Sequence, residues 1–127
     1  MPDHAALRSA VVVAGMFLTL VAQANAADPA AGKSVFSAQC SICHSPLPGK
    51  NMVGPSLFGV VGRKTGSVSG FHYSAANLAA NLTWDEATLD KYLQSPRTMV
   101  PGTMMTYGGL KDDAKRADLI AYLATLK

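Results

Sequence analysis

The chain has 127 residues, 15% charged side chains and a formal net charge of +3. This length suits one domain rather than two, and the chain lacks the Lys/Arg block that a nucleic-acid-binding protein carries. A small domain with only 7% aromatic residues has a modest core and often needs a staple or a cofactor to be stable.

The N-terminal segment has the pattern of an export signal. Arg8 gives a weakly basic start, residues 10–22 form an uncharged apolar run, and small residues stand at Ala24 and Ala26. This order is typical of a secretory signal peptide, and the run is short for a membrane-spanning helix, which needs about 20 residues. We expect a signal peptide over 1–26 cleaved after Ala26, a mature domain over 27–127 with an unchanged net charge, and a periplasmic location. A membrane anchor that stays uncleaved is the alternative.

The first helix of the mature chain is predicted from Asp28 as N-cap, with Pro29 at the first helical position, to about Gln39. The next segment, 45–63, is rich in proline and glycine and is expected to be a loop. Ser74 is expected to cap a short helix that runs through Ala80.

Two more helices are predicted in the C-terminal half. Thr83 and Glu86 form a capping box for a helix that ends near Ser95, before Pro96, and the segment 96–110 is expected to be irregular. Asp112 and Asp113 favour a helix start, and an apolar stripe follows at Leu119, Ile120, Leu123 and Leu126. The pattern predicts an all-α domain with long loops.

The only two cysteines lie in the stretch Cys40-Ser-Ile-Cys43-His44. A disulfide across so short a loop would stabilise little, a thioredoxin-like pair needs a βαβ pattern that the chain lacks, and a structural zinc site needs four ligands, for which His72 is the one further histidine in the mature chain. The remaining interpretation is C-x-x-C-H, the attachment motif of a c-type haem.

The spacing of this motif has a physical reason. Positions i, i+3 and i+4 share one face of a helical turn, so both thiols can reach the two vinyl groups of one porphyrin while His44 binds the iron. The second axial ligand decides the function, because methionine suits electron transfer whereas an empty position suits sensing or peroxide chemistry. The residues alone leave the candidates open: His72, Met52, Met99, Met104 and Met105.

Nearly all of the mature chain resembles the class I c-type cytochromes, and especially the mitochondrial cytochrome c type and its soluble bacterial relatives. The matching segments are GKSVFSAQCSICH, VGPSLFGVVGRKTGSVSGFHYSAAN, LTWDEATLDKYLQSPRTMVPGTMM and RADLIAYLATLK, in the family's order. The resemblance implies four to five short helices and long loops wrapped around one haem c, attached through Cys40 and Cys43. Alignment of the P-G-T-x-M sequence implies Met105 as the second iron ligand, with Met104 as its neighbour and rival.

Further site residues are implied only by this resemblance. Pro55 matches the proline whose carbonyl accepts a hydrogen bond from the ligand histidine. Tyr92, Asn77 and Thr103 match a polar cluster near the ligand sulfur. Arg63, Tyr73 and Trp84 match residues near the haem propionates, and Gly32 and Phe36 match residues that pack against Tyr122 in the last helix.

The resemblance implies a soluble one-electron carrier, not an enzyme, that is monomeric and has no nucleic-acid or small-molecule partner. Its expected partners are redox proteins, such as a membrane oxidase, a reductase complex or a dehydrogenase. The basic residues that are candidates for docking are Lys50, Lys64, Lys91, Arg97 and Lys111, although Met104 stands where basic family members carry a lysine. Two alternatives remain: a membrane-anchored or dedicated haem subunit of a respiratory or dehydrogenase complex, and a haem sensor or peroxidase.

Overall fold

The computed structural model describes residues 26–127, and within that range the secondary structure is helical, with one isolated bridge between Lys64 and Thr83. The predicted signal segment and its alternative, an uncleaved anchor, therefore fall almost wholly outside the described residues. Within residues 26–127, no helix combines the length and the apolar character that crossing a membrane requires. The element order is α1 Pro29–Gln39, α2 Ala75–Ala80, α3 Glu86–Gln94, α4 Pro96–Met99 and α5 Asp113–Ala124.

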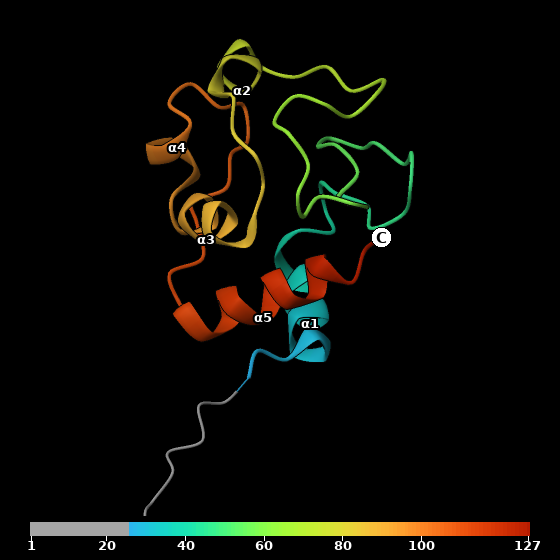
Figure 1. The fold of residues 1–127 in the computed structure, drawn as a ribbon, viewed down its shortest axis with the longest axis vertical. Coiled ribbons are helices and arrows are strands. Elements are labelled where there is room, and N and C mark those ends of the chain that lie inside the picture. The colour runs from blue at the N-terminus through green and yellow to red at the C-terminus, as the bar shows by residue number, and fades with distance from the viewer. Residues whose placement is uncertain (1–25) are drawn as a thin grey trace, which may run out of the picture.

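The first and last helices, α1 and α5, cross at one end of the molecule (Figure 1). Their contact depends on Gly32, because a Cβ atom there would lie 1.9 Å from the backbone oxygen of Asp118. Beside this close approach, the rings of Phe36 and Tyr122 pack with centroids 5.4 Å apart. A Cβ atom on Gly32 would also lie 2.8 Å from Cβ of Tyr122, so the predicted packing of Gly32 and Phe36 against Tyr122 is confirmed.

The bounds of α1, α2 and α5 agree with the sequence prediction. Asp28, Ser74 and Asp112 each accept a hydrogen bond from a backbone N–H of the first turn that follows. These caps satisfy donors that have no partner inside the helix. The local sequence alone was therefore enough to place three helix starts.

The start of α3 differs from the prediction. Its N-cap is Asp85, whose side chain accepts from the backbone N–H of Thr88, so the expected capping box at Thr83 and Glu86 does not form. Thr83 lies instead in the bridge to Lys64, and the N–H of Trp84 donates to the carbonyl of Arg63. Pairing with the segment 63–64 of the same chain keeps 83–84 extended and moves the helix start by two residues.

The segment 96–110 is also less irregular than expected. Pro96 begins the short helix α4, with proline in the first turn, where its missing N–H costs nothing. The helices α3 and α4 pack together and α3 contacts α5. The rest of the segment, Val100–Leu110, is a loop that runs from α4 to α5 past the side of α3 (Figure 1), and we call it the methionine loop.

Candidate functional site

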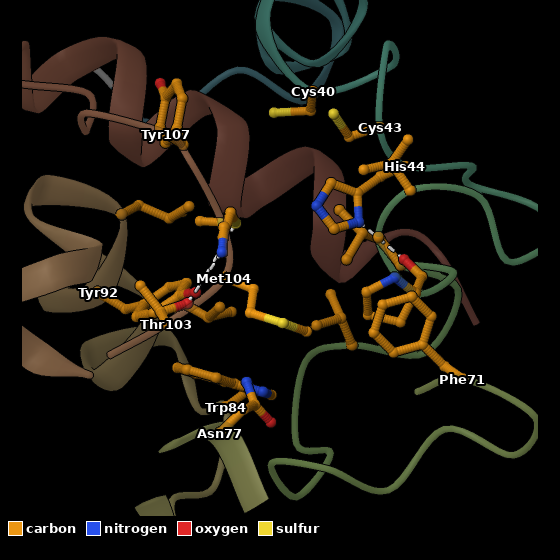
Figure 2. A pocket seen from close by; sticks show the side chains of 18 of the residues that line it. Cys40, Cys43, His44, Phe71, Asn77, Trp84, Tyr92, Thr103, Met104 and Tyr107 are labelled. Carbon is orange, nitrogen blue, oxygen red and sulfur yellow. Dashed lines mark hydrogen bonds between the residues drawn. The ribbon is translucent and has the colours of Figure 1, made fainter. Parts of the chain in front are cut away.

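A cavity of about 360 Å³ lies between the end of α1, the loop 42–74, α3 and the methionine loop. In Figure 2, the cysteine sulfurs and the ring of His44 point into it from one side, and Tyr92, Thr103 and Met104 face them from the other. Its size falls in the range of small-molecule and cofactor sites, about 300–1,000 Å³. Much of its wall is apolar core, including Val60, Leu89, Leu93, Leu119 and Leu123.

Cys40 and Cys43 reach the cavity from the turn that ends α1. The N–H groups of Cys43 and His44 both donate to the carbonyl of Cys40, at 3.1 and 2.9 Å, which gathers the three side chains at one wall. The two thiols are not bridged. Burial, together with the neighbouring Cys43, raises the pKa of Cys40 to about 11, so this sulfur is a neutral thiol at pH 7.

The ring of His44 is held by a backbone carbonyl from across the loop. Its Nδ1 lies 2.8 Å from the carbonyl oxygen of Pro55, and because a carbonyl only accepts, Nδ1 carries the proton and Nε2 keeps its lone pair. Burial is the largest cause that lowers the pKa of His44, and the charge of Arg63 adds to it, against the opposing effect of the Pro55 carbonyl. The imidazole is therefore a neutral nitrogen donor.

Gly54 makes room for this ring. A Cβ atom on Gly54 would lie 2.2 Å from Cε1, 2.6 Å from Nδ1 and 2.8 Å from Nε2 of His44, far inside van der Waals contact. Glycine is thus required here by a side chain ten positions earlier. The sequence indicated a role for Pro55 but not for Gly54, although the Gly-Pro pair marks an unusual turn.

The methionine loop separates the two adjacent methionines. The Sδ atom of Met105 lies 3.7 Å from the hydroxyl of Tyr92, which donates to it. The backbone N–H of Met105 donates to Oγ1 of Thr103 at 3.2 Å. Met105 is half-buried against the core, whereas Met104 is 60% exposed, although both line the cavity.

The other candidate ligands lie elsewhere. Met52, Met99 and His72 do not line the cavity. Met99 packs against the core, and Met52 and His72 are exposed. Within residues 26–127 no cluster of three or more His, Cys, Asp or Glu side chains is placed to hold a metal ion, so the zinc set with His72 is not assembled there.

A polar group lines another part of the cavity. Nε of Arg63 is buried without a hydrogen-bond partner, although its Nη1 donates to the carbonyls of Ser56 and Phe58. Burial lowers the pKa of Arg63. Tyr73 accepts from the backbone N–H of Val68 and so keeps its own hydroxyl proton for another acceptor.

The remaining predicted residues also line the cavity. Trp84 is 7% exposed and packs on Tyr92 with ring centroids 4.6 Å apart, and Oδ1 of Asn77 is buried without a partner. Two lining aromatic residues were not marked by the sequence analysis: Phe71, which packs edge-on against Tyr73, and Tyr107, which bonds Gln39. Phe71 stands within the family-like segment 53–77, which was the available signal, whereas Tyr107 lies in the segment 96–110 that was expected to be irregular.

These features fit a covalently bound haem. The cavity offers two thiols, a neutral imidazole nitrogen, a thioether sulfur and apolar walls, which are the groups that a c-type haem requires. The orphaned Nε of Arg63 fits the carboxylate of a propionate, because a buried donor without a partner is costly. In contrast, the five basic residues predicted to favour docking, Lys50, Lys64, Lys91, Arg97 and Lys111, are exposed and do not line the cavity.

Comparisons with known proteins agree with this site. Residues 27–123 match a family described as cytochrome c oxidase, cbb3-type, subunit III. The chain is 52% identical over 117 residues to cytochrome c2 of Rhodomicrobium vannielii, covering 91% of this chain and 93% of that protein, and 50% identical over 100 residues to cytochrome c2 of Rhodopila globiformis, covering 79% and 94%. The solved structure of cytochrome cH from Methylobacterium extorquens superposes with a TM-score of 0.73 at 45% identity, covering 77% of this chain and 98% of that one. The all-α fold, the C-x-x-C-H turn facing a methionine loop and these identities show that the chain belongs to the class I c-type cytochromes, the electron carriers that bind haem c covalently.

Proposed function

We propose that the chain carries single electrons with His44 and Met105 as the two axial ligands of its iron and with Cys40 and Cys43 as the thioether anchors. The observation that carries this proposal is the placement of a neutral imidazole and of the Met105 sulfur, which accepts from Tyr92, on the walls of one cavity. Haem c supplies an iron that alternates between Fe(II) and Fe(III). If His44 and Met105 both bind the iron, no open position on the metal would be left for a substrate.

The surrounding side chains tune and hold this site. The Pro55 carbonyl fixes the ring of His44 and increases its basicity as a ligand. The Tyr92 hydroxyl, by donating to the Met105 sulfur, reduces the electron density that the sulfur offers and so favours the reduced state. Arg63 and Tyr73 each keep a free donor for a buried carboxylate, and we assign them, with Trp84, to the propionates.

Asn77 and Thr103 complete the polar side of the site. Thr103 accepts from the N–H of Met105 and thereby fixes the backbone next to the ligand. The Oδ1 atom of Asn77 is buried and lacks a partner, so a donor from the bound group or from a water molecule must satisfy it.

The proposed partners are redox proteins that dock for short times, such as an oxidase, a reductase complex or a dehydrogenase. The exposed basic residues are available for charge steering, which acts mainly on the association rate. We further propose export to the periplasm with cleavage after Ala26, because the segment 1–26 has the composition of a signal peptide. We also propose that the chain works as a monomer.

One alternative has an observation in its favour. The matching family carries the description of an oxidase subunit, which suits a dedicated subunit of a respiratory complex. The carrier is favoured because the chain covers 93% or 94% of two relatives named cytochrome c2. Membrane fractionation, together with mass spectrometry of the mature N-terminus, separates the two: a carrier is recovered in the periplasmic fraction and begins at Ala27.

The ligand assignment is tested by absorption spectroscopy of the oxidised holoprotein. The weak near-red band of an iron–methionine bond is expected in the wild type and in Met104→Ala, and it is expected to vanish in Met105→Ala. Met104→Ala is the matched control because it removes the same side chain one residue away. Loss of the band in Met104→Ala alone, or rapid carbon monoxide binding by the reduced wild type at neutral pH, would overturn the proposal.

A further inference from the structure

Arg116 is a buried cation that the proposed site does not use. It lies in α5, is 4% exposed, and donates with three different nitrogens to three different segments. Its Nε binds Asp90 of α3 at 2.6 Å, its Nη1 binds the carbonyl oxygen of Leu110 at 2.9 Å, and its Nη2 binds Asp113 in the first turn of α5 at 2.7 Å. A buried arginine with all three directions occupied is fixed in place, because the geometry of its planar fork is rigid.

The second of these contacts, with the carbonyl of Leu110, is made to the last residue of the methionine loop. Leu110 is held at both of its backbone groups, since its N–H donates to the carbonyl of Leu93 at 2.8 Å while its own carbonyl accepts from Arg116. Its side chain is 6% exposed in the core. The preceding Gly109 runs so close to α3 that a Cβ atom there would lie 2.2 Å from the backbone oxygen of Gln94.

Between Met105 and Leu110 the loop is supported through a side chain, because the Tyr107 hydroxyl donates to Gln39 and Tyr107 packs against the core. In the described chain, no backbone–backbone hydrogen bond involves residues 106–109. On the other side of the ligand, the N–H of Thr103 donates to Val100 and the N–H of Met105 to Thr103. The backbone at Met105 is therefore fixed by the turn before it and by the Leu110 anchor five residues after it, with the Tyr107 side chain as a contact between them.

We propose that Arg116 is a positioning residue for the sulfur ligand: through the Leu110 carbonyl it fixes the end of the methionine loop to α3 and α5 and keeps Met105 in reach of the iron. This inference rests on Met105 being the ligand, as proposed above. Losing one partner of a buried charged hydrogen bond leaves the other unsatisfied, which weakens the anchor by more than the bond alone is worth. Lysine cannot replace the arginine, because the three N–H bonds of an ammonium diverge from one nitrogen and cannot match partners placed around a planar guanidinium.

Imidazole binding to the oxidised holoprotein tests the proposal. Imidazole occupies the iron only when the sulfur has left, so its apparent affinity reports the fraction of molecules with an open loop. We expect Arg116→Lys to bind imidazole about tenfold more tightly than the wild type, which corresponds to losing one charged hydrogen bond that holds the loop closed. The control is Ile120→Val or Ile120→Ala, whichever loses the same free energy of unfolding in urea. Ile120 is buried on the same helix but does not line the cavity.

A merely structural role of Arg116 predicts equal imidazole affinities in the two stability-matched variants, and that result overturns the proposal. If Arg116→Lys does not fold, Asp90→Asn decides, with Glu86→Gln as its charge-matched control on α3. A gain of imidazole affinity in Asp90→Asn alone supports the proposal, and equal affinities in the two overturn it. The near-red band of the wild type is read separately: its absence defeats the ligand assignment, whereas its presence with equal variants defeats only the role of Arg116.

Discussion

Gly54→Ala is the sharpest perturbation of the histidine side of the site. The added methyl carbon would lie 2.2 Å from Cε1 of His44, whereas carbon atoms in contact stay about 3.5–4.0 Å apart. The imidazole or the loop must therefore move by about 1.3 Å or more. A shift of that size is enough to break the 2.8 Å bond from Nδ1 to Pro55 and to turn Nε2 away from the direction in which it would bind the iron.

The expected loss of stability follows from two effects. Overpacking of a filled site costs about 1–3 kcal/mol, and the lost hydrogen bond adds about 0.5–1.5 kcal/mol. We expect the free energy of unfolding of the oxidised holoprotein to fall by about 2–4 kcal/mol, measured in guanidinium chloride. A changed near-red band is expected as well, because a displaced His44 ring would weaken the bond that we propose between Nε2 and the haem iron.

Gly108→Ala is the matched control for this experiment. A Cβ atom on Gly108 would meet nothing within 4 Å, and its φ lies outside the left-handed region, so alanine there changes stability by at most about 1 kcal/mol. Should Gly54→Ala match Gly108→Ala in both unfolding free energy and spectrum, the steric argument for His44 would be refuted, and with it the orientation of the imidazole that the proposed function needs.

Three further outcomes are expected. Tyr92→Phe removes the donor to the Met105 sulfur and is expected to lower the reduction potential by about 20–60 mV, measured by spectroelectrochemistry, while Tyr107→Phe leaves it nearly unchanged; a rise in Tyr92→Phe contradicts the assignment. Hydrogen bonds from Thr88 hold the pKa of Asp85 below its usual value of 3.8, so its charged form stabilises the fold above that pH and this contribution is lost as the pH falls below it; thermal unfolding of Asp85→Asn should lose less stability between pH 5 and pH 3 than the wild type, and parallel curves would refute this. Chain without haem is expected to be largely unfolded by circular dichroism, and a cooperative, well-dispersed NMR spectrum would contradict that.

Local sequence signals placed most helix ends correctly because capping is a short-range interaction. Asp28, Ser74 and Asp112 act on residues two or three positions ahead, so their roles are visible in a window of a few residues. The capping role predicted for Thr83 was wrong because Lys64, 19 positions earlier, pairs with Thr83 in a bridge. A capping-box pattern cannot reveal such a competing partner.

The site divides along the same line. Motif spacing predicted the two cysteines and His44 at the cavity, and the resemblance to the family added Met105 and the polar residues. All of these residues line the cavity. Pro55 lines it as well and supplies the predicted carbonyl. Gly54 and Arg116 were not predicted, because their importance comes from groups that fold against them. Arg116 does share a helix face with Leu119, Ile120 and Leu123, and a charge on that stripe was the signal available.

The cavity and the hydrophobic core are largely the same residues, which ties folding to haem binding. Leu89, Leu93, Leu119 and Leu123 are buried in the core and also line the cavity, so without haem their inner sides lack a packing partner. The contact of α1 with α5 through Gly32 is separate, since that residue does not line the cavity. Helices of 11 and 12 residues are marginal alone in water, so this crossing can leave only weak residual helicity in haem-free chain. The loops that carry the proposed ligands His44 and Met105 contain no helix of that length, so we expect their order to appear together with haem binding.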